Sequence, residues 1–257
     1  MARIRAPMET KKLGPLTVRR LVKPGATREN HGDKAAPQVI VLCHGFGAPG
    51  DDLVALADAI DVPPGTVFLF PQALHALQDL LGQALYADAR CWWLIDFARL
   101  ERAMAPNGSA ELRDLSAEIP EGLADARAAL SEMLDALEKE ERPSRLVLGG
   151  FSQGAMLSLD LALREPERKL AGLVLLSGTM IAEHEWRPLM AAAGDRRMPV
   201  FQSHGDSDPI LPFAIAERLR DALTESGLDV TFEPFAGPHT IPPRALQRLS
   251  GWLRALP

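Results

Sequence analysis

Cysteine is scarce in this sequence of 257 residues, which contains only Cys43 and Cys91. The two positions lack the close spacing of metal ligands, so a metal site built on cysteines is excluded. Cys43 ends an apolar run and is expected to be a buried filler. We expect both thiols to be free in a reducing cytoplasm, and a Cys43–Cys91 disulfide is the alternative that the sequence leaves open.

An excess of positive charge is also missing, since 28 Lys and Arg accompany 34 Asp and Glu for a formal net charge of −6. This balance argues against a nucleic-acid partner, because no face is obviously basic. Residues 1–14 carry four basic side chains and no apolar core, so they predict neither a signal peptide nor a membrane span. We expect them to form a flexible or edge segment of a cytoplasmic protein without stable membrane insertion.

Repeats, low-complexity tracts and linkers are absent from the sequence as well. The apolar content of 47% and the charged content of 24% are ordinary for a globular protein. Because α/β domains of this length are often single, residues 1–257 are expected to form one domain. The oligomeric state is left open, with a homodimer as one alternative.

Short β-type runs alternate with amphipathic stretches along the chain. Strands are expected at Leu16–Val22, Gln38–Cys43, Thr66–Phe70, Arg145–Leu148, Leu173–Leu176, Pro199–Ser203 and Val230–Phe235. Helices are expected from the caps Asp51 and Asp52 to about Ile60, from Leu123 to just before Pro143, and over about 214–226 and 243–256. The alternation predicts an α/β fold, with a mostly parallel central sheet and helices on both faces.

The run Gly150-Phe151-Ser152-Gln153-Gly154 lies between an apolar β-type run and a helix-prone stretch. A serine flanked by glycines at minus two and plus two, between a strand and a helix, is typical of the nucleophile elbow of serine hydrolases. The sharp turn exposes the Ser152 hydroxyl, and the helix directs its free N–H groups at developing negative charge. The alternative interpretation is a glycine-rich turn without chemistry.

A serine nucleophile requires a histidine base and an acid that orients it, in the chain order Ser, Asp or Glu, His for this kind of fold. His31, His44, His75 and His184 precede Ser152 or lie in helical surroundings, and His204 precedes the acid candidates. His239 alone follows the last expected strand, so it is the predicted base. Its other interpretation is an exposed loop histidine.

Two aspartates in the loop after the Pro199–Ser203 strand are candidates for the acid. Asp206 suits the role of a turn former, whereas Asp208 precedes a proline that stiffens the loop. Asp208 is therefore predicted to reach Nδ1 of His239. Asp206 stays open as the alternative.

The oxyanion of the reaction requires backbone donors, and one of them should come from a glycine-containing loop after an early strand. The loop His44-Gly45-Phe46-Gly47 directly follows the strand that ends at Cys43. The predicted donors are the backbone N–H groups of Phe46 and Gln153. His44 is expected to be a structural residue that holds this loop.

Four blocks of this sequence together resemble the phospholipase/carboxylesterase family of small α/β-hydrolases, which are related to acyl-protein thioesterases. The blocks are His44–Gly47, Gly150–Gly154, His204–Pro209 and Gly237–His239, and the resemblance runs from about Pro37 to Trp252. It implies an α/β-hydrolase fold with a seven-stranded sheet, hydrolysis of carboxylic or thiol esters, and no metal or organic cofactor. It also implies a catalytic triad of Ser152, Asp208 and His239.

Two departures from the family pattern weaken the transfer of a depalmitoylating role. The run after the predicted base is Thr240-Ile241-Pro242-Pro243, which differs from the sequence that eukaryotic thioesterases usually carry there. The middle segment Leu74–Pro120 is also longer than a minimal member needs. We expect this segment to be a substrate-pocket insertion. Met104–Ser109 would be a mobile stretch beside the pocket that acts as a partial lid.

The insertion contains Trp92 and Trp93, two of only four tryptophans in the chain. Similar runs of an arginine and two aromatic residues lie beside the catalytic serine in bacterial relatives, so both rings are predicted to form a wall of the acyl pocket. Phe46 and Leu176 are expected to supply further apolar surface. The alternative is that the two rings only pack the core.

Since no cationic cluster suggests a charged head group, the predicted reaction is hydrolysis of small to medium uncharged acyl esters or thioesters through an acyl-enzyme. A serine peptidase and a catalytically silent binding protein remain alternatives.

Overall fold

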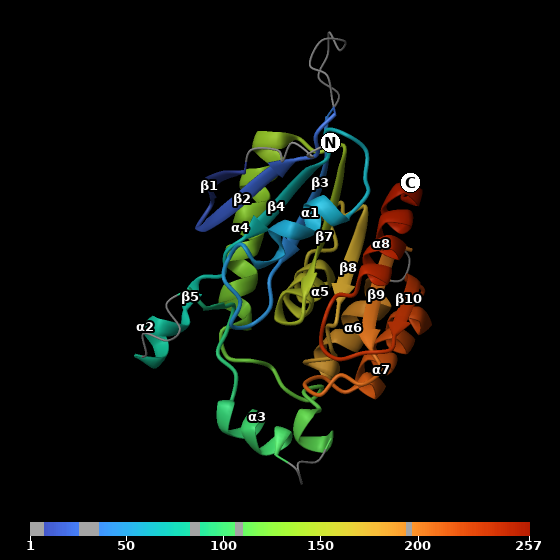
Figure 1. Cartoon of the computed structure of the whole chain (residues 1–257). Coiled ribbons are helices and arrows are strands. Elements are labelled where there is room, and N and C mark those ends of the chain that lie inside the picture. Colours follow the sequence, from blue (N-terminus) through green and yellow to red (C-terminus); the bar gives the residue numbers. More distant parts are fainter. Residues whose placement is uncertain (1–7, 26–35, 83–87, 106–109, 194–196) are drawn as a thin grey trace.

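Eight strands form one central sheet in the part of the chain that the structure describes (Figure 1). The structure is a computed structural model, and it describes residues 8–25, 36–82, 88–105, 110–193 and 197–257. The strands lie in the order β1 (Glu9–Leu13), β2 (Leu16–Val22), β4 (Val67–Pro71), β3 (Gln38–Cys43), β7 (Arg145–Phe151), β8 (Gly172–Leu176), β9 (Pro199–Gly205) and β10 (Asp229–Phe235). The six strands from β4 to β10 run parallel, whereas β1 and β2 are antiparallel to their neighbours. The predicted mostly parallel sheet is therefore confirmed.

Strand β1 at the sheet edge accounts for the difference from the seven strands that the family resemblance implies. It pairs with β2 from Glu9 opposite Arg20 to Leu13 opposite Leu16. Gly14 in the intervening turn has a φ of 51°, and a Cβ there would lie 3.0 Å from the backbone of Glu132 in α4. A glycine is thus required for the tight hairpin that adds this strand.

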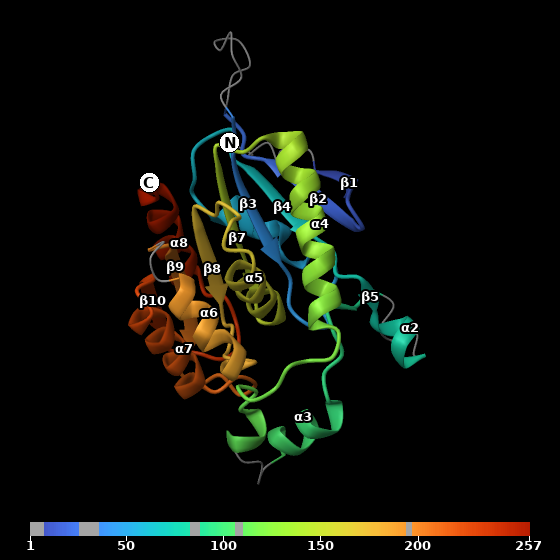
Figure 2. The same ribbon diagram turned by 180° about the vertical axis from the view of Figure 1, so that it is seen from behind.

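Helices cover both faces of the sheet. Figure 2 shows one face, which is covered by α4 (Leu123–Glu141), α5 (Gln153–Arg164), α6 (Glu183–Ala193) and α7 (Phe213–Glu225). The short α1 (Leu56–Ala59) and α8 (Pro243–Ala255) lie on the other face (Figure 1). Side chains alternate along each buried strand, so Val39 and Val41 of β3 pack in the core beneath α4 and α5, while Ile40 and Leu42 pack beneath α1 and α8. Because both faces of β3 are buried, its sequence is a nearly continuous apolar run.

The helix expected from Asp51 to Ile60 is wrong in detail. The structure has a 3₁₀ helix at Asp52–Ala55, and α1 follows it. Asp51 precedes the 3₁₀ helix with a φ of −112° and a ψ of 7°, and its side chain makes no capping hydrogen bond. A side-chain cap needs an extended backbone at that position, which Asp51 does not adopt.

The middle segment forms small elements at the carboxyl edge of the sheet. Strands β5 (His75–Ala76) and β6 (Arg90–Cys91) pair as a separate two-stranded ribbon, and α2 (Leu77–Leu81) follows β5. Helix α3 (Phe97–Met104) and the 3₁₀ turn η3 (Ala110–Arg113) lie beyond the ends of the parallel strands (Figure 1). Of the lid expected at Met104–Ser109, residues 106–109 lie outside the described residues.

Cys43 and Cys91 are both buried and free, as expected. Burial raises the pKa of the Cys43 thiol to about 12 and that of the Cys91 thiol to about 11. No helix among the described residues is long and apolar enough to cross a membrane.

Candidate active site

A cavity of about 460 Å³ lies where the carboxyl ends of the parallel strands meet. It is lined by residues that follow four strands, namely Phe46 after β3, Ser152 after β7, Leu211 after β9 and His239 after β10. In an open α/β sheet, sites gather at this edge because the loops from successive strands converge there. Five of the predicted site residues thus line one space, namely Phe46, Trp93, Ser152, Gln153 and His239.

Ser152 occupies a strained turn between β7 and α5. Its φ of 54° and ψ of −118° are unusual for a residue with a side chain, and its N–H donates to the carbonyl oxygen of Leu176 at 2.8 Å. A Cβ on Gly150 would lie 2.4 Å from the carbonyl oxygen of Cys43, and one on Gly154 would lie 2.1 Å from the same atom. Both glycines are therefore required for the close approach of this turn to β3. The geometry is that of a nucleophile elbow.

His239 contacts the carboxylate of Asp208. Its Nδ1 lies 2.6 Å from Oδ2 of Asp208, and its ring lies 4.7 Å from that of Phe151 between centroids. The second oxygen of Asp208, Oδ1, accepts hydrogen bonds from the N–H groups of Ile210 at 2.8 Å and Leu211 at 2.9 Å. A carboxylate held in this way fixes both the orientation and the tautomer of a histidine, leaving Nε2 of His239 without a proton to accept one.

The environment keeps Asp208 ionised. Burial raises the pKa of this carboxyl, but hydrogen bonds to the side chains of His204 and His239 outweigh burial and hold the pKa well below its ordinary value of 3.8. Asp206 differs, because its Oδ1 accepts a hydrogen bond from the backbone N–H of Gly237 at 3.1 Å. Asp206 thus braces the loop that carries His239, which differs from the turn-forming role within its own loop that the sequence suggested.

His204 contacts the site, which the sequence did not predict. Its Nε2 lies 3.3 Å from Oδ2 of Asp208, and the side chain is fully buried. Sequence reasoning set His204 aside because it precedes Asp208 in chain order. The four-residue spacing between them, across a turn containing Gly205, is the signal that could have found the contact.

His44 holds the loop that follows β3. Its Nε2 accepts a hydrogen bond from the N–H of Ala73 at 3.1 Å, so the proton is on Nδ1, which donates to the carbonyl oxygen of Gly45 at 2.8 Å. Burial lowers the pKa of His44 to about 4. The ring is therefore neutral and serves two backbone groups, in agreement with the structural role expected for it.

Gln153 connects the nucleophile elbow to the middle segment through its side chain. Its Oε1 accepts from the N–H of Trp92 at 2.9 Å, and its Nε2 donates to the carbonyl oxygen of Trp93 at 2.8 Å. Its backbone N–H belongs to the first turn of α5, where such groups have no partner within the helix. The two backbone groups predicted as oxyanion donors belong to residues that line the cavity, Phe46 and Gln153.

The two adjacent tryptophans have different surroundings, which corrects the prediction that both wall the cavity. Trp93 lines the cavity, whereas Trp92 does not, and its fully buried indole Nε1 donates to the carbonyl oxygen of His44 at 3.0 Å. Strand β6 ends at Cys91 and the chain bends at both tryptophans, so the two adjacent rings lie in different surroundings. Leu176 is also fully buried and is not a lining residue, unlike Phe46.

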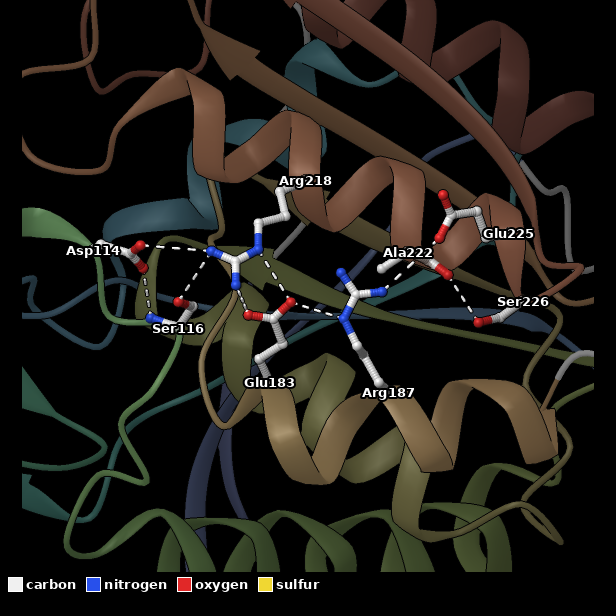
Figure 3. Close-up of polar contacts among 8 residues, drawn as sticks. All are labelled: Asp114, Ser116, Glu183, Arg187, Arg218, Ala222, Glu225 and Ser226. Carbon is white, nitrogen blue, oxygen red and sulfur yellow. Dashed lines mark hydrogen bonds and ion pairs between the residues drawn. The ribbon is translucent and has the colours of Figure 1, made fainter. Parts of the chain in front are cut away.

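A network of ion pairs anchors the cavity wall between η3 and Pro120 (Figure 3). Arg218 of α7 pairs with Glu183 of α6, and its Nη1 lies 3.6 Å from Oδ2 of Asp114 and 3.4 Å from Oγ of Ser116. Arg99 of α3 donates to the carbonyl oxygen of Asp114 at 2.8 Å and pairs with Glu118. Arg99 and Arg218 are thus paired within the protein, and many of the side chains that line the cavity are apolar, including Leu112, Leu115, Ile119 and Met156.

The other candidate histidines lie elsewhere. His75 belongs to β5, His184 is exposed on α6, and His31 lies outside the described residues. Among the described residues, no group of three or more His, Cys, Asp or Glu side chains is arranged to hold a metal ion.

Comparison with known proteins places this geometry in context. Residues 28–256 match the sequence profile of the Phospholipase/Carboxylesterase family. The chain is 31% identical over 182 residues to acyl-protein thioesterase 1 of Kluyveromyces lactis, covering 69% of this chain and 72% of that protein. The crystal structure of esterase PE8 matches with a TM-score of 0.64 and 27% identity, over 87% of this chain and 94% of that one. The acyl-protein thioesterase 2 of Zea mays shares the fold, with a TM-score of 0.69 and 21% identity over 92% and 96% of the two chains.

Proposed function

Because this chain belongs to the phospholipase/carboxylesterase family, we propose that it cleaves acyl esters or thioesters with Ser152, His239 and Asp208 as its catalytic triad. Family membership makes the chain a serine hydrolase of ester or thioester bonds. The observation that carries the assignment of residues is the 2.6 Å contact between Nδ1 of His239 and Oδ2 of Asp208, at a cavity that Ser152 also lines. The strained backbone of Ser152 supports it further.

In the proposed first step, Oγ of Ser152 attacks the acyl carbonyl carbon while Nε2 of His239 removes the hydroxyl proton. Asp208 stabilises the resulting imidazolium without taking its proton. The tetrahedral intermediate then collapses, the C–O or C–S bond breaks, and His239 gives the proton to the leaving alcohol or thiol. In the second step His239 deprotonates a water molecule that hydrolyses the acyl-enzyme, which releases the carboxylic acid and regenerates Ser152.

The negative charge of the tetrahedral oxygen requires fixed donors. We assign this role to the backbone N–H groups of Phe46 and Gln153. The second of these lies at the positive end of the α5 dipole, which favours an anion there. Hydrogen bonds from the Trp92 indole to His44 and from Ala73 to His44 hold the loop that carries Phe46.

The proposed substrates are small to medium uncharged acyl esters or thioesters. The cavity volume of about 460 Å³ and the apolar lining around Trp93, Ile181 and Met156 support an acyl chain rather than a polar group. The charged wall residue Arg99 is paired with Glu118 and is therefore occupied within the protein.

The test is hydrolysis of p-nitrophenyl esters and the matching thioesters from acetyl to palmitoyl, by the native chain and by Ser152→Ala. We expect the native chain to turn over a range of these substrates with burst release of the first product. The Ser152→Ala variant should lose roughly 10⁴-fold or more in kcat while keeping its circular dichroism spectrum. Turnover by Ser152→Ala within tenfold of the native rate would refute the nucleophile. Absence of turnover by the native chain, with binding of the same esters retained, would favour the catalytically silent alternative.

Several expectations from the sequence accompany this proposal as predictions. They are a single domain, a cytoplasmic location, no nucleic-acid partner, and no metal or organic cofactor.

A further inference from the structure

A second histidine reaches the carboxylate that His239 contacts. His204, the sixth residue of β9, is fully buried, and its Nε2 lies 3.3 Å from Oδ2 of Asp208 and 2.9 Å from the carbonyl oxygen of Leu211. Nδ1 of His239 lies 2.6 Å from the same Oδ2. One carboxylate oxygen is thus shared by two imidazole rings that approach it from β9 and from the loop after β10.

The surroundings of His204 determine where its proton lies. Nε2 faces two oxygen acceptors, whereas Nδ1 is buried without a hydrogen-bond partner among the described residues. A proton on Nδ1 would leave a buried donor unsatisfied and would set the Nε2 lone pair against two oxygens. These contacts favour the tautomer with its proton on Nε2, which donates to the carbonyl oxygen of Leu211 and lies 3.3 Å from Oδ2 of Asp208.

The carboxylate of Asp208 is consequently held at both oxygens. The N–H groups of Ile210 and Leu211 hold Oδ1, and Nε2 of the buried His204 lies 3.3 Å from Oδ2. The ring of His204 is itself confined by Phe213, whose centroid lies 6.2 Å away. Rotation of the carboxylate away from His239 would break the hydrogen bonds from Ile210 and Leu211 and the contact with His204.

We propose that His204 is a positioning residue of the hydrolysis, which holds Oδ2 of Asp208 toward His239 and withdraws part of the negative charge that His239 would otherwise receive. The inference rests on the proposed function, because it takes Asp208 as the partner of the base. Its chemical consequence is that the base holds its proton less tightly and is active at lower pH than it would be with Asp208 alone.

Two other charged side chains on the adjoining loops must stay unchanged in any test. Arg113 donates from Nη1 to the carbonyl oxygen of Pro209 at 3.0 Å, and Asp206 accepts from the N–H of Gly237 at 3.1 Å. Substitutions confined to His204 leave both contacts available. A change in pH dependence would then be attributable to the contact with Asp208.

The test compares His204→Phe, which keeps a planar ring without a donor, with His204→Gln, whose amide N–H can replace Nε2–H. For His204→Phe we expect kcat to fall by roughly ten- to a hundredfold, as for loss of a hydrogen bond to a charged group, with KM nearly unchanged. We also expect the acid limb of the pH profile of kcat/KM to move to higher pH. His204→Gln should restore both the rate and the position of the limb. If His204→Phe does not fold, His204→Asn takes its place, because that side chain is too short to reach Oδ2.

An acid limb that stays in place in His204→Phe, or a rate that His204→Gln does not restore, would overturn the positioning role and leave His204 a purely structural residue. A readout without turnover is the far-downfield proton resonance of Nδ1–H of His239, identified by its loss in Asp208→Asn. It should move in His204→Phe and return in His204→Gln, and an unchanged resonance would equally overturn the inference. Full activity in Asp208→Asn would instead refute the proposed triad, so the two failures are distinguishable.

Discussion

The side-chain amide of Gln153 donates a hydrogen bond to the carbonyl oxygen of Trp93 at 2.8 Å, which connects the residue after Ser152 to the wall of the cavity. The same amide accepts from the N–H of Trp92 at 2.9 Å. Since Gln153 is buried, both backbone groups depend on this one side chain. The wall and the elbow therefore keep a fixed distance from each other.

Replacing Gln153 with leucine should destabilise the fold and displace the wall together. Two buried backbone groups would lose their partner, so we expect the free energy of unfolding to fall by about 2–4 kcal/mol. The kcat/KM for longer esters should fall more than that for acetate, because the proposed acyl site lies against this wall. Urea denaturation and ester kinetics measure the two effects. Gln247→Leu on the exposed face of α8 is the matched control and should change neither. Unchanged unfolding of Gln153→Leu would contradict the connection.

The two aspartates after β9 should differ sharply when each is changed to asparagine. Asp208→Asn leaves His239 in the wrong tautomer and removes the charge that stabilises its imidazolium, so kcat should fall by about 10⁴-fold. Asp206→Asn keeps an oxygen that can accept from Gly237 and should cost only a few-fold. Steady-state kinetics on both variants check the ranking. The reverse order would assign the acid to Asp206.

The activity should rise with pH and then level, because a protonated His239 cannot act as the base. The pKa of Asp208 is lowered, so this carboxylate stays ionised throughout the assay range, and His44, with a pKa of about 4, stays neutral there. Neither group can account for a limb between about pH 5 and 8, where histidines commonly titrate. A flat kcat/KM over this interval, measured in buffers of constant ionic strength, would argue against a histidine base.

The lowered pKa of Asp208 also has a consequence for stability, with a definite sign. A carboxyl that binds its proton more weakly in the folded chain stabilises the fold above its ordinary pKa of 3.8, and this contribution is lost as the pH falls through the lower folded value. The acid dependence of unfolding should accordingly be shallower in Asp208→Asn than in the native chain.

Alanine substitutions should separate the two tryptophans. Trp93→Ala removes part of the cavity wall and enlarges the cavity. The ratio of kcat/KM between acetyl and hexanoyl esters should therefore shift several-fold, since each buried methylene contributes up to about 0.8 kcal/mol. Trp92→Ala removes a fully buried ring and should destabilise the fold by about 3–5 kcal/mol without a specific effect on chain length. Thermal unfolding and chain-length profiles of both variants decide this. Equal chain-length shifts in the two variants would mean that both rings contact the acyl chain.

Much of the fold could be predicted from local pattern. The strand expected at Gln38–Cys43 has the same bounds in the structure, and that at Pro199–Ser203 is only two residues longer. The first of these strands is buried on both faces and is therefore marked by a continuous apolar run from Val39 to Cys43. The edge strand β1 is half exposed and charged, and its sequence Glu-Thr-Lys-Lys-Leu carries no such signal. Its pairing depends instead on the turn at Gly14.

Candidate site residues whose position follows from chain order could be identified in the sequence. Contacts that depend on packing could not. The motif around Ser152 and the position of His239 after the last strand follow from the order of the elements. The different environments of Trp92 and Trp93 depend on how the chain bends at these two residues, and adjacency in sequence does not give that. The contact between His204 and Asp208 depends on how the loop after β9 folds back, which composition alone does not reveal.

The two buried thiols allow local opening of the structure to be measured by alkylation. Cys43 lies within the sheet between β4 and β7, whereas Cys91 lies in the small ribbon next to the cavity wall. An alkylating reagent reacts with an exposed thiolate. In the folded state both thiols are buried and their pKa values are raised, so neither should react. The rate of alkylation at Cys43 therefore reports disruption of the sheet, and the rate at Cys91 reports local opening beside the cavity, without any introduced cysteine.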